Sequence, residues 1–144
     1  MYLIKDIAVI IPTRNRPKKI NRLLSDLLKF NTSIGKVIVI SSGSNINNII
    51  DIYINKLNLL HIHSSQGQIK QRNIGINNLD EDIKLVATLD DDIILFENSF
   101  DNVLKFWNKA NKNTGGEGFN VVNYGKKNIK RKFLQIIFRN FFLK

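Results

Sequence analysis

Four short apolar runs, spaced along the chain, constrain the fold of this sequence more than any other feature. Each is bounded by polar or turn-forming residues, and each is rich in Ile, Val or Leu. Such runs are typical of strands that are buried on both faces, as in a parallel sheet. The four predicted strands are Ile7–Ile11, Val37–Ile40, Leu59–Ile62 and Leu85–Leu89.

Amphipathic stretches lie between these runs and predict helices. The first begins at Pro17, which suits the first turn of a helix, and it repeats apolar residues at helical spacing: Ile20, Leu23, Leu24, Leu27 and Leu28. We predict further helices over residues 46–57, over residues 68–79 with Ile69, Ile74, Ile76 and Leu79 facing inward, and from Asn98 or Ser99 to about Asn111. Residues 119–123 predict another strand. This alternation predicts an α/β fold, a Rossmann-like and mainly parallel sheet flanked by helices.

The positive charge of the chain is concentrated at its C-terminal end. The 144 residues include 22 Lys and Arg and 12 Asp and Glu, but seven of these basic residues and no acidic residue lie in residues 126–144. The same segment is rich in Phe, Leu and Ile, so it predicts a basic amphipathic helix that contacts a membrane surface or packs on another part of a protein. No nucleic-acid-binding motif accompanies the charge, so we expect no nucleic acid partner. We therefore expect a domain over residues 1–125 and a basic amphipathic tail over residues 126–144.

The composition excludes several kinds of site and segment. The chain has no Cys, which excludes disulfides, thiolate metal sites and a cysteine nucleophile. Lys5 and Asp6 interrupt the N-terminal segment, which therefore does not resemble a signal peptide. No apolar run reaches the length of about 18 residues that predicts a membrane-spanning helix. We expect a cytoplasmic protein, with the basic tail as its means of reaching the cytoplasmic face of a membrane.

Three adjacent carboxylates, Asp90, Asp91 and Asp92, follow the last of the four predicted strands. Adjacent carboxylates repel one another, and a bound cation would relieve that repulsion. Mg²⁺ and Mn²⁺ prefer oxygen ligands and often share them with the phosphates of a substrate. The triplet therefore indicates a metal and diphosphate site at the carboxyl end of a parallel strand. The alternative is a solvated acidic turn.

Other polar side chains would open on the same edge of the sheet. The loops Pro12–Arg16 and Ser41–Ser44 follow the first two strands, and parallel sheets bind ligands beyond the carboxyl ends of their strands. Thr13 and Arg14 could hydrogen-bond a base or a ribose, or could simply stabilise a turn. Arg72 could pair with a phosphate or with one of the aspartates, the alternative being an exposed helix residue.

Two histidines, His61 and His63, flank Ile62 on the third predicted strand. Residues at alternate positions of a strand share a face, so the two imidazoles could bind one metal ion. A convincing metal site needs more ligands than a pair, and no third ligand lies near them in the sequence. We therefore interpret them as ordinary histidines at the end of a strand.

Three segments resemble family 2 glycosyltransferases, which have the GT-A fold. Ala8–Arg16 resembles the opening strand of that family and its loop. Gly67–Gly75, with Arg72-Asn73-Ile74-Gly75, resembles the "G…ARNxG" segment, and Leu89–Asp92 resembles the DXD segment. The three occur in the family's order and cover roughly residues 7–125.

This resemblance implies a donor of the nucleotide-diphosphate-sugar type, with UDP or GDP, and a Mn²⁺ or Mg²⁺ ion. The implied reaction is transfer of the sugar to an acceptor hydroxyl, with inversion at the anomeric carbon. The acceptor would be a glycan or a lipid-linked molecule in surface polysaccharide or glycoconjugate synthesis. The implied donor-binding residues are Pro12, Thr13, Arg14, Ser42, Arg72, Asp90 and Asp91, and the implied metal ligands are Asp92 and Asp90.

The sequence departs from the family pattern in two places. Ser41-Ser42-Gly43-Ser44 stands where the family usually has DDGS, so a serine hydroxyl replaces the carboxylate that holds the base. The family usually continues well past its DXD segment into an acceptor-binding half that contains the catalytic base, and neither Asp101 nor Glu117 lies in a recognisable base context. We therefore expect an incomplete enzyme or, alternatively, a non-catalytic module that binds a nucleotide sugar or a partner. A phosphotransferase of the haloacid dehalogenase type is disfavoured. Its aspartate motif normally begins the first strand of its core, whereas the aspartates here follow the fourth predicted strand.

Overall fold

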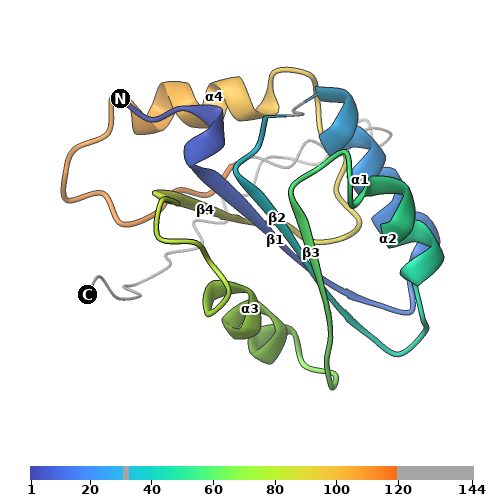
Figure 1. Ribbon diagram of the computed structural model, residues 1–144. Helices are drawn as coiled ribbons and strands as arrows, with labels where there is room; N and C mark the ends of the chain where they lie inside the picture. The colour runs from blue at the N-terminus through green and yellow to red at the C-terminus, as the bar shows by residue number, and fades with distance from the viewer. Residues whose placement is uncertain (31–32, 120–144) are drawn as a thin grey trace, which may run out of the picture. The chain divides into compact units, whose positions relative to one another are not determined.

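A parallel sheet of four strands, in the order β3-β2-β1-β4, forms the centre of the first of two compact units, Met1–Asn108 and Lys109–Lys144 (Figure 1). The computed structural model describes residues 1–30 and 33–119. The strands are β1 Ile7–Arg14, β2 Lys36–Ser42, β3 Leu59–His63 and β4 Leu85–Thr88. All three strand pairings are parallel, so the α/β fold predicted from the alternation of apolar and amphipathic segments is confirmed.

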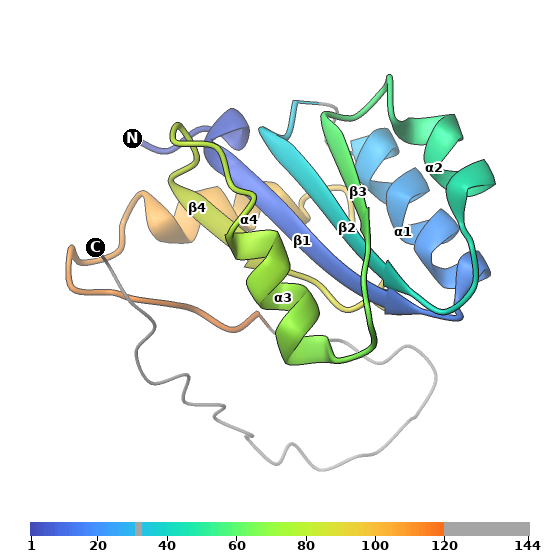
Figure 2. The same cartoon turned by 60° about the horizontal axis from the view of Figure 1, so that its bottom comes forward.

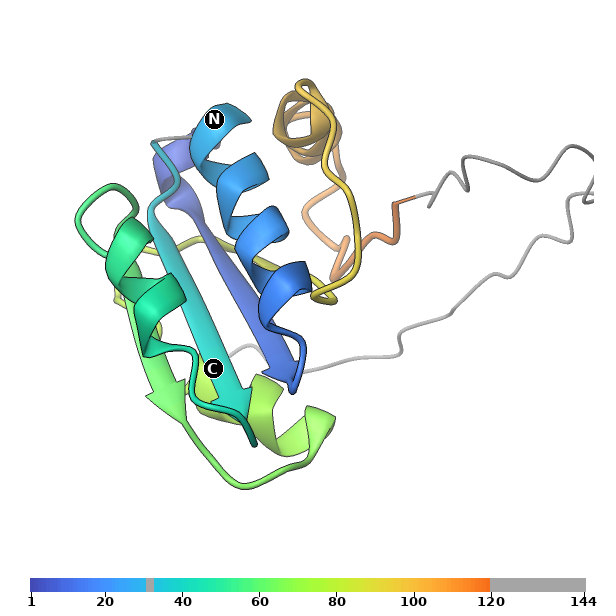
Figure 3. The same cartoon turned by 90° about the vertical axis from the view of Figure 1, so that its right-hand side faces the viewer.

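Helices cover both faces of this sheet. They are α1 Pro17–Phe30, α2 Asn47–Tyr53, α3 Gln68–Ile76 and α4 Ser99–Trp107, and a short 3-10 turn precedes β1. The larger core joins α1, α2 and α4 to one face of β1 and β2, where α1 and α2 lie next to each other (Figure 3). Among the described helices, α3 alone covers the other face (Figure 2). Its smaller core consists of Ile10, Ile38 and Ile40, packed against Ile74, Leu79 and two residues of β3.

The central strand β1 is buried on both faces, as predicted. Ile7–Ile11 is fully inaccessible to solvent, because helices pack above and below it and strands flank it on both sides. Gly75 lets α3 approach this strand closely, since a Cβ atom there would lie 2.5 Å from Cγ2 of Ile10. The carboxyl end of β1 is therefore held firmly at the middle of the sheet.

Strand β4, predicted from the apolar run Leu85–Leu89, is less buried than this run indicates. Strand β4 pairs only with β1 among the described residues, and along it Val86 is 46% exposed while Leu85 is 8% exposed. An edge strand keeps one long side open to solvent, and the apolar run did not reveal which strand lies at the edge. The expectation that both faces of Leu85–Leu89 are buried is therefore wrong.

Three helices also differ from the predictions in length or orientation. Helix α4 ends at Trp107 rather than at about Asn111. Helix α2 ends at Tyr53 rather than Leu57, and α3 ends at Ile76 rather than Leu79. Ile69 and Ile76 were expected to face inward but are 76% and 49% exposed. The reason is that α3 turns Gln71 and Gly75 toward the sheet, a polar residue and a residue without a side chain, which the apolar spacing does not mark.

The second unit contributes only residues 109–119 to the described structure, and these form turns and extended chain. Phe119 is not part of a strand, and the rest of the strand predicted over residues 119–123 lies outside the described residues. The tail over residues 126–144 lies outside them as well. Within the part of the chain that is described, no helix has both the length and the apolar character needed to cross a membrane.

Candidate functional site

At the carboxyl edge of the sheet, the end of β1 and its loop contact the acidic triplet on one side and the loop after β2 on the other. The Thr13 hydroxyl donates a hydrogen bond of 2.7 Å to Oδ2 of Asp91. On the other side of β1, Oδ1 of Asn15 accepts hydrogen bonds from the backbone N–H and the hydroxyl of Ser44, at 2.7 and 2.9 Å. Gly43 has φ of +80° and lies against the Asn15 side chain, so this loop pair requires a glycine there. The expected convergence of the three loops is thus present.

Asp91 is the most deeply buried member of the triplet. It is 4% exposed, and its two oxygens are both occupied, Oδ2 by Thr13 and Oδ1 by Nη1 of Arg16 at 2.9 Å. The hydrogen bond and charge of Asp91 raise the pKa of Arg16 above its ordinary value. A buried carboxylate that pairs with a charged group and accepts a hydrogen bond from a hydroxyl is held in a fixed position. These contacts connect the end of β1 and the start of α1 to the segment that follows β4.

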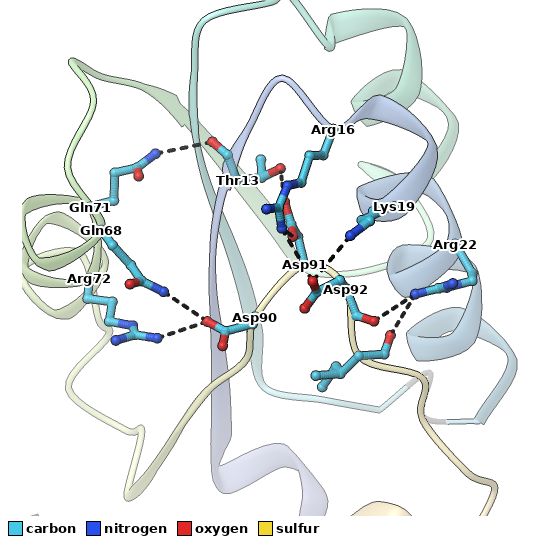
Figure 4. A network of polar contacts seen from close by, with 11 residues as sticks. Thr13, Arg16, Lys19, Arg22, Gln68, Gln71, Arg72, Asp90, Asp91 and Asp92 are labelled. Carbon is cyan, nitrogen blue, oxygen red and sulfur yellow. Dashed lines mark hydrogen bonds and ion pairs between the residues drawn. The ribbon is translucent and has the colours of Figure 1, made fainter. Parts of the chain in front are cut away.

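Asp92 faces α1 (Figure 4). Its Oδ2 lies 3.2 Å from Nζ of Lys19 and 3.4 Å from Nη1 of Arg16, and Nη2 of Arg22 donates to its backbone carbonyl at 2.9 Å. The hydrogen bond from Lys19 lowers the pKa of Asp92, and the charges of Lys19 and Arg16 add to this effect. These pairs are about half exposed, so each one contributes modestly to stability.

Asp90 faces α3 on the opposite side (Figure 4). Its Oδ1 accepts hydrogen bonds from Nη2 of Arg72 at 2.9 Å and from Nε2 of Gln68 at 3.0 Å. The Asp90 side chain is 54% exposed, and the Arg72 side chain is 30% exposed. The predicted pairing of Arg72 with an aspartate is therefore present. In addition, Nε of Arg72 is buried and has no hydrogen-bond partner within the described ranges.

The remaining predicted residues line the same edge without joining this network. Arg14 and Ser42 are neighbours across β1 and β2, and Pro12 lies two pairs inside them, next to Ile40. Arg14 is exposed and makes no hydrogen bond or ion pair with a described residue. Ser42 is 2% exposed, and its hydroxyl lacks a partner in the described part of the chain. A buried hydroxyl without a partner is costly, so Ser42 is well suited to bond a ligand group.

Several polar residues of the site were not predicted. These are Arg16, Lys19, Arg22, Gln68 and Gln71. The first three recur every third residue, which places them on one face of α1, and Gln68 precedes Arg72 by one helical turn, so the spacing contained a signal for both groups. Gln71 gave no such signal: its amide bonds the carbonyls of Ile40 and Thr13, at 2.8 and 3.3 Å, and both contacts depend on the folded sheet.

The carboxylates fit a metal that is shared with a ligand better than one held by protein alone. No cluster of three or more Asp, Glu, His or Cys suitable for a metal ion occurs among the described residues. The contacts of Asp90 go to Oδ1 and the ion pairs of Asp92 go to Oδ2, so the second oxygen of each is outside these pairs. One or two carboxylates suffice for Mg²⁺ when phosphates supply further ligands.

His61 and His63 meet at a buried hydroxyl on the neighbouring strand. Oγ of Ser41 lies 2.8 Å from Nε2 of His61 and 3.2 Å from Nδ1 of His63. Burial lowers the pKa of His61, and the charge of His63 lowers it further. His61, His63 and the Ser41 hydroxyl therefore form a hydrogen-bonded group at the end of β3. From the sequence, the two histidines were interpreted as ordinary residues at the end of a strand.

A cavity lies at the opposite, amino edge of the sheet. Its walls include residues that precede the strands: Lys5, Asp6, Gly35, Asn58 and Lys84. Asp6 is 5% exposed and pairs with Lys84 at 3.0 Å. The hydrogen bond from the backbone N–H of Leu3 lowers the pKa of Asp6, and the Lys84 pair adds to this. This cavity is the competing location for a ligand.

Comparisons with known proteins agree with the fold. Two crystal structures of S. aureus TarS are similar, one of residues 1–349 with a TM-score of 0.63 and 27% identity, the other with 0.62 and 25%. Each similarity covers 72% of this chain, but only 32% and 19% of the TarS chains. No curated protein was found to match.

The match to a family model is more extensive. The model described as Glycosyl transferase family 2 matches residues 8–142, which is nearly the whole chain. The opening strand, the Arg72 segment and the aspartate triplet all lie within that range, and the parallel sheet with helices on both faces is that of the GT-A neighbours. The chain therefore belongs to glycosyl transferase family 2 and has the GT-A fold.

Proposed function

We propose that this chain binds a nucleotide-diphosphate sugar at the carboxyl edge of the sheet and transfers its sugar to an acceptor hydroxyl. The supporting observation is that the three family segments contact one another directly. Thr13 after β1 bonds Asp91, and Arg72 on α3 bonds Asp90, at 2.7 and 2.9 Å. Segments that are far apart in the sequence thus supply adjacent polar groups where parallel sheets bind their ligands.

We assign different parts of the donor to different described residues. The unpartnered Ser42 hydroxyl and the exposed Arg14 lie side by side at the ends of β2 and β1, and we assign the base and ribose to them. Arg72 has a buried Nε without a partner in the described part, which would bond the nucleotide. The free oxygens of Asp90 and Asp92 would hold Mn²⁺ or Mg²⁺, whose charge stabilises a departing diphosphate.

The transfer itself is proposed to invert the anomeric carbon. The acceptor hydroxyl attacks that carbon from the side opposite the bond to the diphosphate, the carbon–oxygen bond breaks with its electron pair going to the diphosphate, and the hydroxyl proton passes to a general base that is not among the residues assigned to the donor. A glycan or lipid-linked acceptor in surface polysaccharide synthesis is the class that the family favours, and the basic tail over residues 126–144 would bring the chain to a membrane.

A non-catalytic donor-binding module is the second candidate. It is favoured by the contacts of the triplet, which come from hydroxyl, amide and cationic side chains among the described residues, whereas neither Asp101 nor Glu117 contacts it. The chain spans about a third of one TarS chain and about a fifth of the other. Both candidates share the donor site, and they differ in turnover.

Measuring turnover separates the two candidates. The purified chain is incubated with UDP- and GDP-sugars, Mn²⁺ and candidate glycan or lipid-linked acceptors, and release of the nucleoside diphosphate is followed. Acceptor-dependent release that falls strongly in Arg72→Gln, but not in the control Lys56→Gln in the exposed turn after α2, supports the transferase. Donor binding without release supports the binding module. If the chain neither binds a donor nor releases a nucleoside diphosphate, both candidates are contradicted.

A further inference from the structure

One cation of the site is anchored on its buried side and open on its outer side. Arg16 makes a short ion pair of 2.9 Å with Asp91, a carboxylate that is 5% exposed at the side chain, while the Arg16 side chain itself is 50% exposed. Both of its pairs use Nη1, so Nη2 and Nε make no hydrogen bond to the residues described. The guanidinium is therefore fixed in place with free donors, which is the arrangement that suits recognition of phosphate oxygens.

Lys19 lies in the first turn of α1, and Arg16 directly precedes that helix; both contact Asp92. Its Nζ contacts only Asp92 within the described part of the chain, at 3.2 Å, and both side chains are nearly half exposed. The second pair of Arg16, also to Asp92, is long at 3.4 Å. Exposed pairs of this length contribute little, so a ligand can replace them at small cost, whereas the buried pair with Asp91 persists.

The charge balance of the site also favours an anionic ligand. Four cationic side chains contact the triplet loop, namely Arg16, Lys19, Arg22 and Arg72, against three carboxylates. The first turn of α1 contains no acidic residue, so Lys18 and Lys19 stand unfavourably at the positive end of the helix dipole. A bound diphosphate would relieve both the excess positive charge and this unfavourable placement.

We propose that Arg16 and Lys19 bind the diphosphate of the donor, and that Asp91 is the positioning residue that fixes Arg16 for this task. This assignment rests on the proposed donor-binding function and adds two ligand-binding residues at the start of α1 to the Arg72 side of the site. It also gives Asp91 a positioning role in place of direct contact with the donor. Because side chains supply the positive charge, part of the donor affinity persists without a divalent metal.

The test compares ligands with and without a diphosphate. Calorimetric titrations of the full chain use UDP- and GDP-sugars and the matched nucleosides, each with Mn²⁺ and with EDTA. Arg16→Gln and Lys19→Gln are each expected to weaken nucleotide-sugar binding roughly tenfold and to leave nucleoside binding unchanged. Arg16→Lys should restore part of the loss, and the neighbouring exposed Lys18→Gln is the matched control.

Asp91→Asn keeps a side chain of the same shape near Thr13 but removes the charge that holds Arg16. It should reduce the advantage of nucleotide sugar over nucleoside, a ratio that a loss of stability alone would not change. Suppose that the wild-type chain binds the nucleotide sugar. If Arg16→Gln then binds it as tightly as Lys18→Gln does, or weakens nucleotide sugar and nucleoside equally, the inference is overturned, while the proposed donor site is retained. If wild type binds no nucleotide sugar in either buffer, the proposed function fails and the inference fails with it.

Discussion

The two sides of the aspartate triplet are built differently. On the α1 side, formed by Thr13, Arg16, Lys19, Asp91 and Asp92, a buried carboxylate uses both oxygens within the protein. On the α3 side, formed by Gln68, Arg72 and Asp90, the carboxylate is half exposed and only one of its oxygens is engaged. Adjacent residues of the same type therefore have different environments.

This difference shows how one short loop can serve both structure and ligand binding. Asp91 fixes the loop against β1 and α1, so its neighbours are presented in a defined orientation. Asp90 and Asp92 then diverge toward α3 and α1 with an oxygen each outside the ion pairs (Figure 4). The α1 side should therefore dominate the stability of this edge, and the outward groups of both sides should dominate ligand binding.

The strongest way to break the comparison is to remove one carboxylate from each side. Asp91→Ala leaves the buried Thr13 hydroxyl without its acceptor and removes the closest partner of the half-exposed Arg16 guanidinium, so it should lower the free energy of unfolding by about 2–3 kcal/mol. Asp90→Ala should cost below about 1 kcal/mol, because its partners remain solvated. Urea denaturation of both variants measures the two values, and equal losses would contradict the distinction.

The next largest effect concerns the support of the α3 side. Gly75→Ala places a Cβ atom 2.5 Å from Cγ2 of the fully buried Ile10, so α3 must move away from β1. We expect a loss of about 1–2 kcal/mol, as for other overpacked cores. Gly116→Ala is the matched control, since nothing lies within 4 Å of its added Cβ atom. Thermal melting compares the two, and an unchanged melting temperature for Gly75→Ala would show that this close approach is absent.

A third prediction concerns pH and the edge beside β3. Burial holds the pKa of His61 below its ordinary value of 6.5 in the folded chain. As the pH falls, His61 is therefore protonated in the unfolded chain before it is protonated in the folded chain. The stability that depends on neutral His61 is therefore complete above pH 6.5 and is lost as the pH falls through the folded pKa. His61→Asn should flatten this part of the stability profile. A wild-type profile that rises on acidification would have the opposite sign.

The smallest expected effect sharpens the description of Asp92. Lys19→Gln removes the hydrogen bond that lowers the pKa of Asp92, so this pKa should move up toward its ordinary value of 3.8. The stability linked to Asp92 is present above that value and is lost as the pH falls through the lower folded pKa. NMR titration of the carboxyl carbon measures the shift, with Lys18→Gln as control. An unmoved Asp92 in Lys19→Gln would show that the pair is not formed in solution.

The sequence was sufficient to predict the parallel sheet and the meeting of the loop after β1 with the aspartate triplet at one edge. Runs such as Ile7–Ile11 mark buried strands because burial on two faces leaves no room for polar residues. Parallel order then places the loop after β1 and the Asp90–Asp92 loop on one edge, whatever the details of packing. The contact between Thr13 and Asp91 followed from this topology.

The division of labour within the triplet could not be read from the sequence. Three identical residues have no local property that distinguishes them, and the burial of Asp91 depends on contacts with Thr13 and Arg16, 78 and 75 residues away. The inward direction of Gln71 likewise depends on carbonyls of two strands. The position of β4 at the edge of the described sheet depends on strand order, which apolar content does not encode.

The central claim, that the donor binds at the carboxyl edge, is tested most directly by mapping backbone amide shifts in an NMR titration with UDP- and GDP-sugars. We predict that the largest shifts cluster at the ends of β1 and β2, at the start of α3 and in the triplet, including Thr13, Ser42, Arg72 and Asp90. Shifts that instead cluster at the amino-edge cavity, around Lys5, Gly35 and Lys84, would contradict the claim. So would the absence of any saturable shift.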